Sequence, residues 1–316
     1  MAVSDLQGLS RSHGEVSMRE KLTVDSYRGP VFIIGGSRTG SEMHKTILNL
    51  SDSIDIVDET WFLCPWWLRK DFATTVRRSI GPLDDDAAIG KLVDLMYSKK
   101  LFGYFWSVID REIDRRLLHT QLLGSDRTLR AVLDTVIKLR AQANNKAIGG
   151  AKFPVHYSRV SKLMEWFPNC RLIHTVRDPR AVHASQAFKY LRDDHTRIER
   201  ACMRIAQFVH ISIQSCWTAR IHRQLRGYGN YYMSRYEDVV RDPKGSVMKL
   251  CDFLGIEASD AMLQPIQYGS SYRRAQPGVR GISHESANAW KDKLGRGTIK
   301  LINLLNRKAL RTFGYS

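Results

Sequence analysis

A short run of small and basic residues, from Gly35 to Ser41, has the composition of a phosphate-binding loop. Four apolar residues, Val31 to Ile34, precede it and are typical of a short buried strand, and apolar residues at helical spacing follow it. Gly35 and Gly40 allow the backbone to turn its N–H groups inward, and the start of a helix adds the positive end of its dipole. The expected chemistry is therefore the binding of an anionic phosphate group by a strand, a loop and a helix.

The cation of this loop lies inside it, at Arg38. The spacing resembles a Walker A loop, but a Walker A loop ends in Lys followed by Ser or Thr, and here Gly40 is followed by Ser41 and Glu42. Because the hydroxyl residue that holds Mg²⁺ is missing at that place, the sequence predicts a phosphate-bearing ligand that is handled without a metal. A plain strand, turn and helix with a solvated arginine is the alternative.

The composition sets the class of protein and favours an anionic partner. The chain has 316 residues, 43% of them hydrophobic and 26% charged, as in a globular protein with a substantial core. The formal net charge is +17, from 49 Lys and Arg against 32 Asp and Glu. This excess favours a polyphosphorylated cofactor, a nucleic acid, an acidic glycan or a membrane surface as partner. The alternative is a basic surface that is merely solvated.

The cysteines and the N-terminus indicate the compartment. The five cysteines are scattered, with neither a CxxC motif nor paired Cys/His spacing, which indicates no zinc site and no disulfide framework. No apolar run approaches the roughly 20 residues of a membrane span. The first 29 residues are too polar for a signal peptide. We therefore expect a cytoplasmic protein without a membrane span.

We expect a flexible arm over residues 1–29 and a single domain over residues 30–316. Helical patterns, among them a mostly helical segment at 61–140, alternate with strand patterns along the domain, and 268–286 is expected to be irregular. Such alternation predicts an α/β fold with a mainly parallel central sheet flanked by helices. The predicted strands lie at 31–34, 54–57, 148–152, 171–176 and 231–233.

Charged residues stand where several predicted strands end. Asp58 and Glu59 follow the strand at 54–57, Lys152 ends its strand, and Arg177 follows 171–176. In open α/β sheets, ligands bind beyond the carboxyl ends of the strands. We therefore expect these side chains near the loop, although a plain surface acid is the alternative for Glu59.

Three separated segments together resemble the sulfotransferases that use 3′-phosphoadenosine 5′-phosphosulfate (PAPS). IIGGSRTGSE is similar to the family's 5′-phosphosulfate loop, LIHTVRDPRAVHAS to its 3′-phosphate motif, and RYEDVVRDPKGSVMKLCDFLGI to its tyrosine-containing strand end and helix. The resemblance implies a P-loop-like sulfotransferase fold of the bacterial or Golgi-type branch. It also implies PAPS as donor substrate and adenosine 3′,5′-bisphosphate as product.

The resemblance carries over to individual donor-binding residues. The backbone of the loop would hold the 5′-phosphosulfate, and Arg177 with Ser185 would hold the 3′-phosphate. Lys189 and Tyr236 match further positions that contact the nucleotide, and a looser match near the C-terminus adds two more. The complete set is Ser37, Arg38, Thr39, Gly40, Ser41, Glu42, Arg177, Ser185, Lys189, Tyr236, Ser271 and Arg280.

The resemblance also implies catalytic residues. Glu59 would be the general base, while Arg38 and Lys152 would stabilise the negative charge of the leaving bisphosphate. Cytosolic members place a catalytic His two residues after the lysine, where this chain has a proline, whereas Glu59 stands at the same distance from Arg38 as in protein-tyrosine members. Asp58 and His156 remain open as alternative bases.

The expected function is an in-line, metal-independent transfer of the sulfuryl group from PAPS to a hydroxyl or amine of an unidentified acceptor: a glycan, lipid, phenol or peptide. One alternative is a P-loop kinase or other nucleoside-triphosphate enzyme, which needs a Lys after Gly40. Another is a basic nucleic-acid-binding protein without enzymatic activity. Because the sequence has no helix-turn-helix, zinc or RNA-binding fingerprint, we expect no nucleic-acid partner.

Overall fold

The computed structural model describes residues 28–64, 71–103, 105–187, 196–268, 275–282 and 287–315. Its centre is a five-stranded sheet with the order β2-β3-β1-β4-β5, in which every neighbouring pair is parallel. The strands are β1 (Arg28–Gly35), β2 (Ile54–Val57), β3 (Ile148–Phe153), β4 (Arg171–Val176) and β5 (Tyr231–Arg235). The predicted fold class, an α/β fold with a mainly parallel central sheet, is confirmed.

Both faces of the sheet are buried, which explains the uninterrupted apolar run of β1. Phe32 and Ile34 belong to one large core cluster, and Val31 and Ile33 belong to a second one on the opposite face. Alternate residues of a strand point to opposite faces, so a strand covered on both sides must be apolar at every position. β1 lies in the middle of the sheet, and its following loop therefore opens at the centre of the carboxyl edge.

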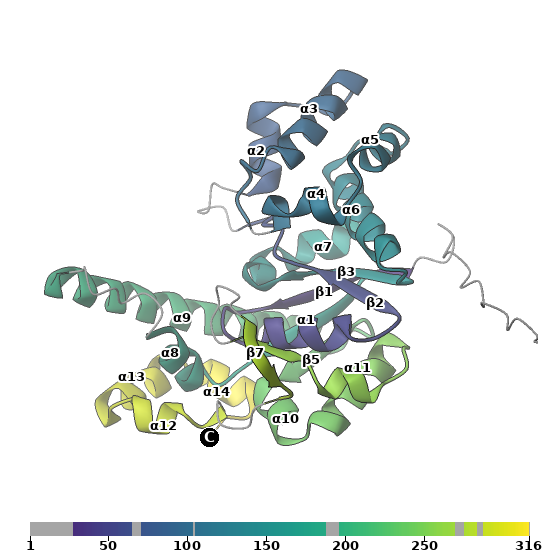
Figure 1. Ribbon diagram of the computed structural model, residues 1–316. Coiled ribbons are helices and arrows are strands. Elements are labelled where there is room, and N and C mark those ends of the chain that lie inside the picture. Colours follow the sequence, from purple (N-terminus) through teal and green to yellow (C-terminus); the bar gives the residue numbers. More distant parts are fainter. Residues whose placement is uncertain are drawn as a thin grey trace, which may run out of the picture.

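Helices cover both faces of the sheet (Figure 1). One face carries α2 (Phe72–Ser79), α3 (Asp86–Tyr97), α4 (Ile109–Glu112), α5 (Arg115–Leu123), α6 (Leu129–Ala143) and α7 (Val160–Trp166), together with two 3₁₀ turns, η2 (Phe105–Ser107) and η3 (Pro154–Arg159). The other face carries α1 (Ser41–Asn49), α8 (Pro179–Ala187), α10 (Tyr236–Arg241), α11 (Pro243–Leu254), η4 (Asp260–Leu263), α12 (Trp290–Lys293), α13 (Arg296–Leu305) and α14 (Arg307–Phe313).

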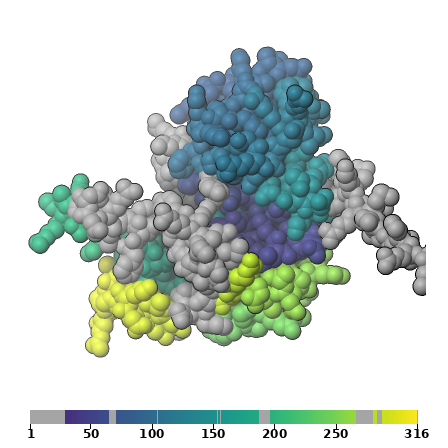
Figure 2. All heavy atoms as spheres, in the orientation of Figure 1, coloured from purple at the N-terminus to yellow at the C-terminus, as the bar shows by residue number. Residues whose placement is uncertain are grey.

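The longest helix is α9 (Arg197–Leu225), which extends away from the sheet at its N-terminal half (Figures 1 and 2). Thr196 and Glu199 form a capping box at its start, in which each side chain accepts a hydrogen bond from the other residue's backbone N–H. Its middle packs against α8 through Gln207 and Phe208, and its C-terminal half packs against α14. A stable helix thus reaches from the sheet edge into solvent.

The sequence expectations differ from the structure in two places. Residues 268–286 were expected to be irregular, but β6 (Ile266–Tyr268) pairs antiparallel with β7 (Ala275–Arg280). Pro277 and Gly278 within β7 disfavour a strand by propensity, and the pairing overrides that preference. The predicted helical tail is divided into α12, α13 and α14, with Gly295 and Asn306 between them.

The expected arm at 1–29 lies outside the described residues except for Arg28 and Gly29, which open β1. The division into an arm and a single domain therefore stays a prediction. In the part of the chain that the structure describes, none of the helices has the length and apolarity needed to cross a membrane.

Candidate active site

The loop between β1 and α1 is held in a tight turn. Gly40 and Arg38 adopt positive φ angles of 95° and 68°, and Gly40 is the N-cap of α1. The Thr39 hydroxyl donates to the Gly36 carbonyl at 2.7 Å and lies 2.8 Å from the Thr175 hydroxyl at the end of β4. The loop therefore has a fixed backbone conformation at the N-terminus of a helix, where an anion is favoured.

Neighbouring side chains leave little room for a Cβ at Gly40 or Gly36. A Cβ added at Gly40 would lie 2.7 Å from the Tyr236 ring, and a Cβ at Gly36 would lie 2.0 Å from the Gln214 amide nitrogen of α9. Gln214 also donates from this amide to the Ser37 carbonyl at 3.4 Å. Side chains from α9 and α10 thus pack directly on the loop.

Arg38 points toward the second predicted motif. Its Nε donates to the Ser185 hydroxyl of α8 at 2.9 Å, although the two residues are 147 positions apart. Arg177, at the end of β4, donates from Nη1 to the Arg38 carbonyl at 3.3 Å. The 5′-type loop and the 3′-type motif of the sequence therefore meet, and their two guanidinium groups concentrate positive charge at one place.

The third predicted segment completes this arrangement. The Arg177 guanidinium carbon lies 4.1 Å from the centroid of the Tyr236 ring, a cation–π contact. The neighbouring acid, Asp178, is directed elsewhere: both its oxygens accept hydrogen bonds from Arg180 at 2.8–3.0 Å. Arg177 is thus held by a carbonyl and an aromatic face, while the adjacent carboxylate is occupied by another arginine.

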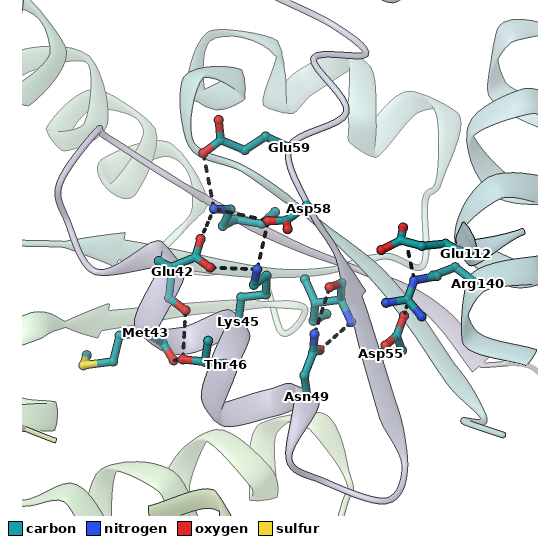
Figure 3. Close-up of polar contacts among 12 residues, drawn as sticks. Glu42, Met43, Lys45, Thr46, Asn49, Asp55, Asp58, Glu59, Glu112 and Arg140 are labelled. Carbon is teal, nitrogen blue, oxygen red and sulfur yellow. Dashed lines mark hydrogen bonds and ion pairs between the residues drawn. The ribbon is translucent and has the colours of Figure 1, made fainter. Parts of the chain in front are cut away.

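A cluster of acids and lysines lies on the other side of the loop, between α1 and the ends of β2 and β3 (Figure 3). The buried Lys152 ammonium group forms ion pairs with Glu42, with Glu59 at 3.3 Å and with Asp58 at 3.7 Å. Lys45 bridges Glu42 and Asp58 at 2.7 and 2.9 Å. Three carboxylates face two ammonium groups, so the cluster keeps one negative charge when all five groups are ionised.

The charges of this cluster are mutually stabilised. Burial alone raises the pKa of the Glu42 carboxyl, but the Lys152 and Lys45 ammonium groups outweigh burial and lower the pKa from 4.5 to about 2. Burial alone lowers the pKa of Lys45, but Glu42 and Asp58 raise it above its ordinary value. Both groups are therefore ionised at neutral pH, and the Glu42 side chain belongs to the ion-pair cluster.

The two alternative bases differ from Glu59 in their surroundings. Glu59 has the more exposed side chain, 31% against 19% for Asp58, and Asp58 lies between two lysines. His156 is buried in η3, and its Nε2 accepts a hydrogen bond from the Leu63 N–H at 3.1 Å. Burial, helped by the charge of Arg159, lowers its pKa to about 3. The ring is thus neutral, with its acceptor nitrogen already occupied.

Several residues of the arrangement were not predicted from the sequence. His44 is buried in α1, where one ring nitrogen lies 2.9 Å from the Gly40 carbonyl and the other 2.7 Å from the Ser234 hydroxyl of β5. Lys45 and Gln214 are the others. The spacing of Lys45, three residues after Glu42 on a helix, is the one local signal that pointed to an ion pair.

Three predicted donor-binding residues are not joined to the loop by the described structure. Lys189 and Ser271 lie outside the described residues. Arg280 ends β7 with an exposed side chain, and no hydrogen bond or ion pair between it and the loop occurs among the described residues. Their roles stay predictions.

The described residues also contain a hollow and no metal-type cluster. A hollow of about 300 Å³ opens between the loop, α8 and α9, lined by Ser37, Gln186, Met203, Ala206, Gln207 and His210. Within the described ranges, no group of three or more His, Cys, Asp and Glu side chains is arranged to hold a metal ion. The carboxylates of the cluster in Figure 3 face lysine ammonium groups instead.

Two solved structures share this fold. The sulfotransferase domain of the Synechococcus olefin synthase aligns with a TM-score of 0.55 and 18% identity, covering 92% of this chain and 96% of that domain. The sulfotransferase domain from the curacin biosynthetic pathway aligns with a TM-score of 0.55 and 17% identity, covering 91% of this chain and 98% of that domain. The predicted P-loop-like sulfotransferase fold is confirmed.

Curated relatives match over shorter stretches. Human carbohydrate sulfotransferase 6 is 29% identical over 167 residues, which cover 46% of this chain and 42% of that protein. The omega-hydroxy-beta-dihydromenaquinone-9 sulfotransferase of Mycobacterium bovis is 30% identical over 110 residues, 33% of this chain and 28% of that protein. The matched stretches thus span less than half the length of these relatives.

A family model matches most of the chain. The model of the sulfotransferase family matches residues 30–260, a range that contains the loop, both arginines, the ion-pair cluster and Tyr236. The chain therefore belongs to the sulfotransferase family.

Proposed function

We propose that this protein transfers the sulfuryl group of PAPS to a hydroxyl or amine of an acceptor. The observation that carries the proposal is the meeting of Arg38, Ser185, Arg177 and Tyr236, which come from three segments far apart in the sequence. A ligand with phosphates at both ends of one nucleoside fits two arginines that are held next to each other at a helix N-terminus. PAPS and adenosine 3′,5′-bisphosphate have this chemistry.

Arg177 and Ser185 are proposed to bind the 3′-phosphate, and the backbone from Ser37 to Glu42 the 5′-phosphosulfate. The planar guanidinium of Arg177 suits the geometry of phosphate oxygens, and its packing on the Tyr236 ring fixes the plane of the guanidinium group. The helix dipole of α1 favours the same negative charge. The site thus binds by preorganised donors, without a large rearrangement.

Glu59 is proposed to remove the proton of the acceptor as its oxygen or nitrogen attacks the sulfur in line. The sulfur–oxygen bond to the 5′-phosphate breaks, and the electron pair leaves with the bisphosphate. Arg38 and Lys152 stabilise this developing negative charge. The contact of Lys152 with Glu59 at 3.3 Å supports a shared site for the base and the cation.

The acceptor class proposed is a hydroxyl compound. One relative is named for carbohydrate and another for an omega-hydroxy menaquinone. A hydroxyl needs a base at neutral pH, and the Glu59 carboxylate of the cluster in Figure 3 is the group proposed for that role.

The donor is tested by thermal shift with two ligands. We expect adenosine 3′,5′-bisphosphate at about one hundred times its dissociation constant to stabilise the protein by about 2.7 kcal/mol, and Mg-ATP at the same concentration to stabilise it far less. Incubation with ³⁵S-labelled PAPS and a cell extract should then yield a labelled product. Stabilisation by Mg-ATP alone, with no labelled product, would favour the kinase alternative.

A further inference from the structure

One face of α9 is apolar and exposed over most of its length. Ile198, Ile205, Val209, Ile213 and Trp217 are between 40% and 77% exposed. Their spacing places them on one side of the helix, opposite the side that carries the buried Ile211, Gln214 and Thr218. We call these five residues the α9 stripe. From residue 198 to residue 217 the stripe is about 30 Å long at 1.5 Å per residue.

The apolar surface continues onto α13. Leu301, Leu304 and Leu305 are 46–69% exposed. Two contacts hold this region against α9: the Asn306 amide donates to the Ser212 hydroxyl at 3.3 Å, and the Cys216 sulfur lies 4.0 Å from the Leu305 carbonyl. The C-terminal end of α13 therefore lies beside α9, and the exposed leucines of α13 extend the apolar surface from there. Exposed apolar side chains that gather in this way mark an interaction site.

The helices that carry this surface are strongly basic. α9 and α13 together contain seven Lys and Arg residues and a single acid, Glu199, and the adjoining α14 adds three more basic residues. Arg220 and Arg223 stand on the exposed side of α9, directly after Trp217. An apolar strip with basic flanks is typical of helices that lie on anionic lipid surfaces.

We propose that α9 and α13 dock this protein on an anionic lipid membrane, with the stripe inserted among the lipid headgroups. Charge decides between the possible occupants. A second copy would bring two strongly basic surfaces together, which is electrostatically unfavourable, whereas anionic headgroups attract each Lys or Arg near the surface. A nucleic acid would satisfy the charge but would leave the apolar stripe in water.

The position of α9 connects this surface with the candidate active site. Met203, Gln207 and His210 on another side of α9 line the hollow beside Ser37 of the loop. Trp217 is suited to the membrane interface, since its ring is apolar and its N–H is polar. Docking through the stripe therefore holds the loop close to the lipid surface.

Flotation of the full chain with vesicles tests the proposal. We expect flotation with vesicles of phosphatidylcholine and phosphatidylglycerol, and little with phosphatidylcholine alone. The double variant Ile205→Asp, Leu304→Asp should lower the vesicle affinity about tenfold or more, since it removes two apolar side chains and adds two negative charges. The matched control Leu117→Asp, Met248→Asp changes two similarly exposed residues on α5 and α11 and should retain the affinity.

A second measurement keeps the test independent of folding defects in the variants. Brominated lipid should quench part of the tryptophan emission of the wild type, and Trp217→Phe should remove that part. Equal flotation of the double variant and the control would overturn the proposal, since binding would then be electrostatic only. A second result would also overturn the proposal: the wild type floats with no vesicle and instead forms a concentration-dependent dimer, which the double variant does not form.

Discussion

Lys152 is the residue through which the acids of the candidate site are connected. Its ammonium group is 3% exposed and is paired with carboxylates from α1 and from the end of β2. A buried ammonium group needs such partners because burial of a charge without them is unfavourable. The lysine thus contacts Glu59 at 3.3 Å, which fits the two roles proposed for it, to orient Glu59 and to stabilise negative charge on a leaving group.

Glu59→Gln should lower turnover by roughly 10²-fold or more, because general-base catalysis contributes about that much. Nucleotide affinity should stay nearly unchanged, since the residues proposed to bind the phosphates lie with Arg38 and Ser185 rather than with Glu59. Steady-state kinetics with labelled PAPS measures the first effect and calorimetry the second. The companion variant is Asp58→Asn, which should lower turnover less than Glu59→Gln does. If it lowers turnover more, Asp58 is the base.

Glu42→Gln tests the electrostatics of the cluster through stability. The folded-state pKa of Glu42 is depressed from 4.5 to about 2, so its contribution is present above pH 4.5 and is lost as the pH falls toward 2. We expect the variant to be less stable at pH 7 by about 1–3 kcal/mol. Its stability should also fall less steeply than that of the wild type between pH 4.5 and pH 2. Urea unfolding at several pH values measures both, and parallel pH profiles would contradict the assignment.

Among the helices and strands, α10 lies close to the loop at Gly40, where its Tyr236 ring limits the space for a side chain. Gly40 has a φ of 95°, and its α-carbon faces the Tyr236 ring. The Tyr236 ring in turn supports Arg177. A side chain at residue 40 therefore disturbs the loop backbone, the tyrosine and the arginine together.

Gly40→Ala should destabilise the protein by about 1–3 kcal/mol and weaken binding of adenosine 3′,5′-bisphosphate, owing to the left-handed backbone and the clash. Gly90→Ala in α3 is the matched control, since an added Cβ there meets nothing within 4 Å. It should stabilise the helix by roughly 0.5–1 kcal/mol. Thermal melts and calorimetry compare the two, and equal behaviour of both variants would show that Gly40 is not constrained.

Two strands could be predicted with the bounds that they have, because nearly all of their residues are buried and the signal lies within the segment itself. β2 and β4 have the predicted bounds, 54–57 and 171–176, because a short run rich in Ile, Val and Leu indicates a buried strand by itself. The order β2-β3-β1-β4-β5 was not predictable, since it depends on which segments pair across long crossovers. The β6–β7 pair was missed for the same reason: its pairing, rather than its sequence, makes it a sheet.

The candidate site was predictable as a set of residue types and not as a set of contacts. Arg177 and Glu59 were predicted to lie near the loop because ligands bind beyond the carboxyl ends of parallel strands. Lys152 and Glu42, however, are 110 residues apart, and no local sequence pattern indicates that they pair. The same holds for His44, whose partner Ser234 is 190 residues away. Such contacts follow from the packing of helices on the sheet, which the sequence pattern alone does not specify.

The positive charge of the whole molecule is concentrated in two regions. Arg38 and Arg177 concentrate part of it at the loop, whereas α9 and α13 carry another part beside their exposed apolar residues. The first suits a small polyanion held by preorganised donors, and the second suits an extended anionic surface. The excess of +17 thus divides into two features with different partners.

Calorimetric titration of the wild type and Arg177→Ala with two nucleotides tests the central claim, that the ends of β1 and β4 hold opposite phosphates of one nucleotide. The ligands are adenosine 3′,5′-bisphosphate and adenosine 5′-monophosphate, which lacks the 3′-phosphate. We predict that the substitution weakens binding of the bisphosphate by about 1.5–3 kcal/mol, roughly 10- to 150-fold, and leaves that of the monophosphate nearly unchanged. Equal affinity of both proteins for the bisphosphate, or an equal loss with both ligands, would contradict the account.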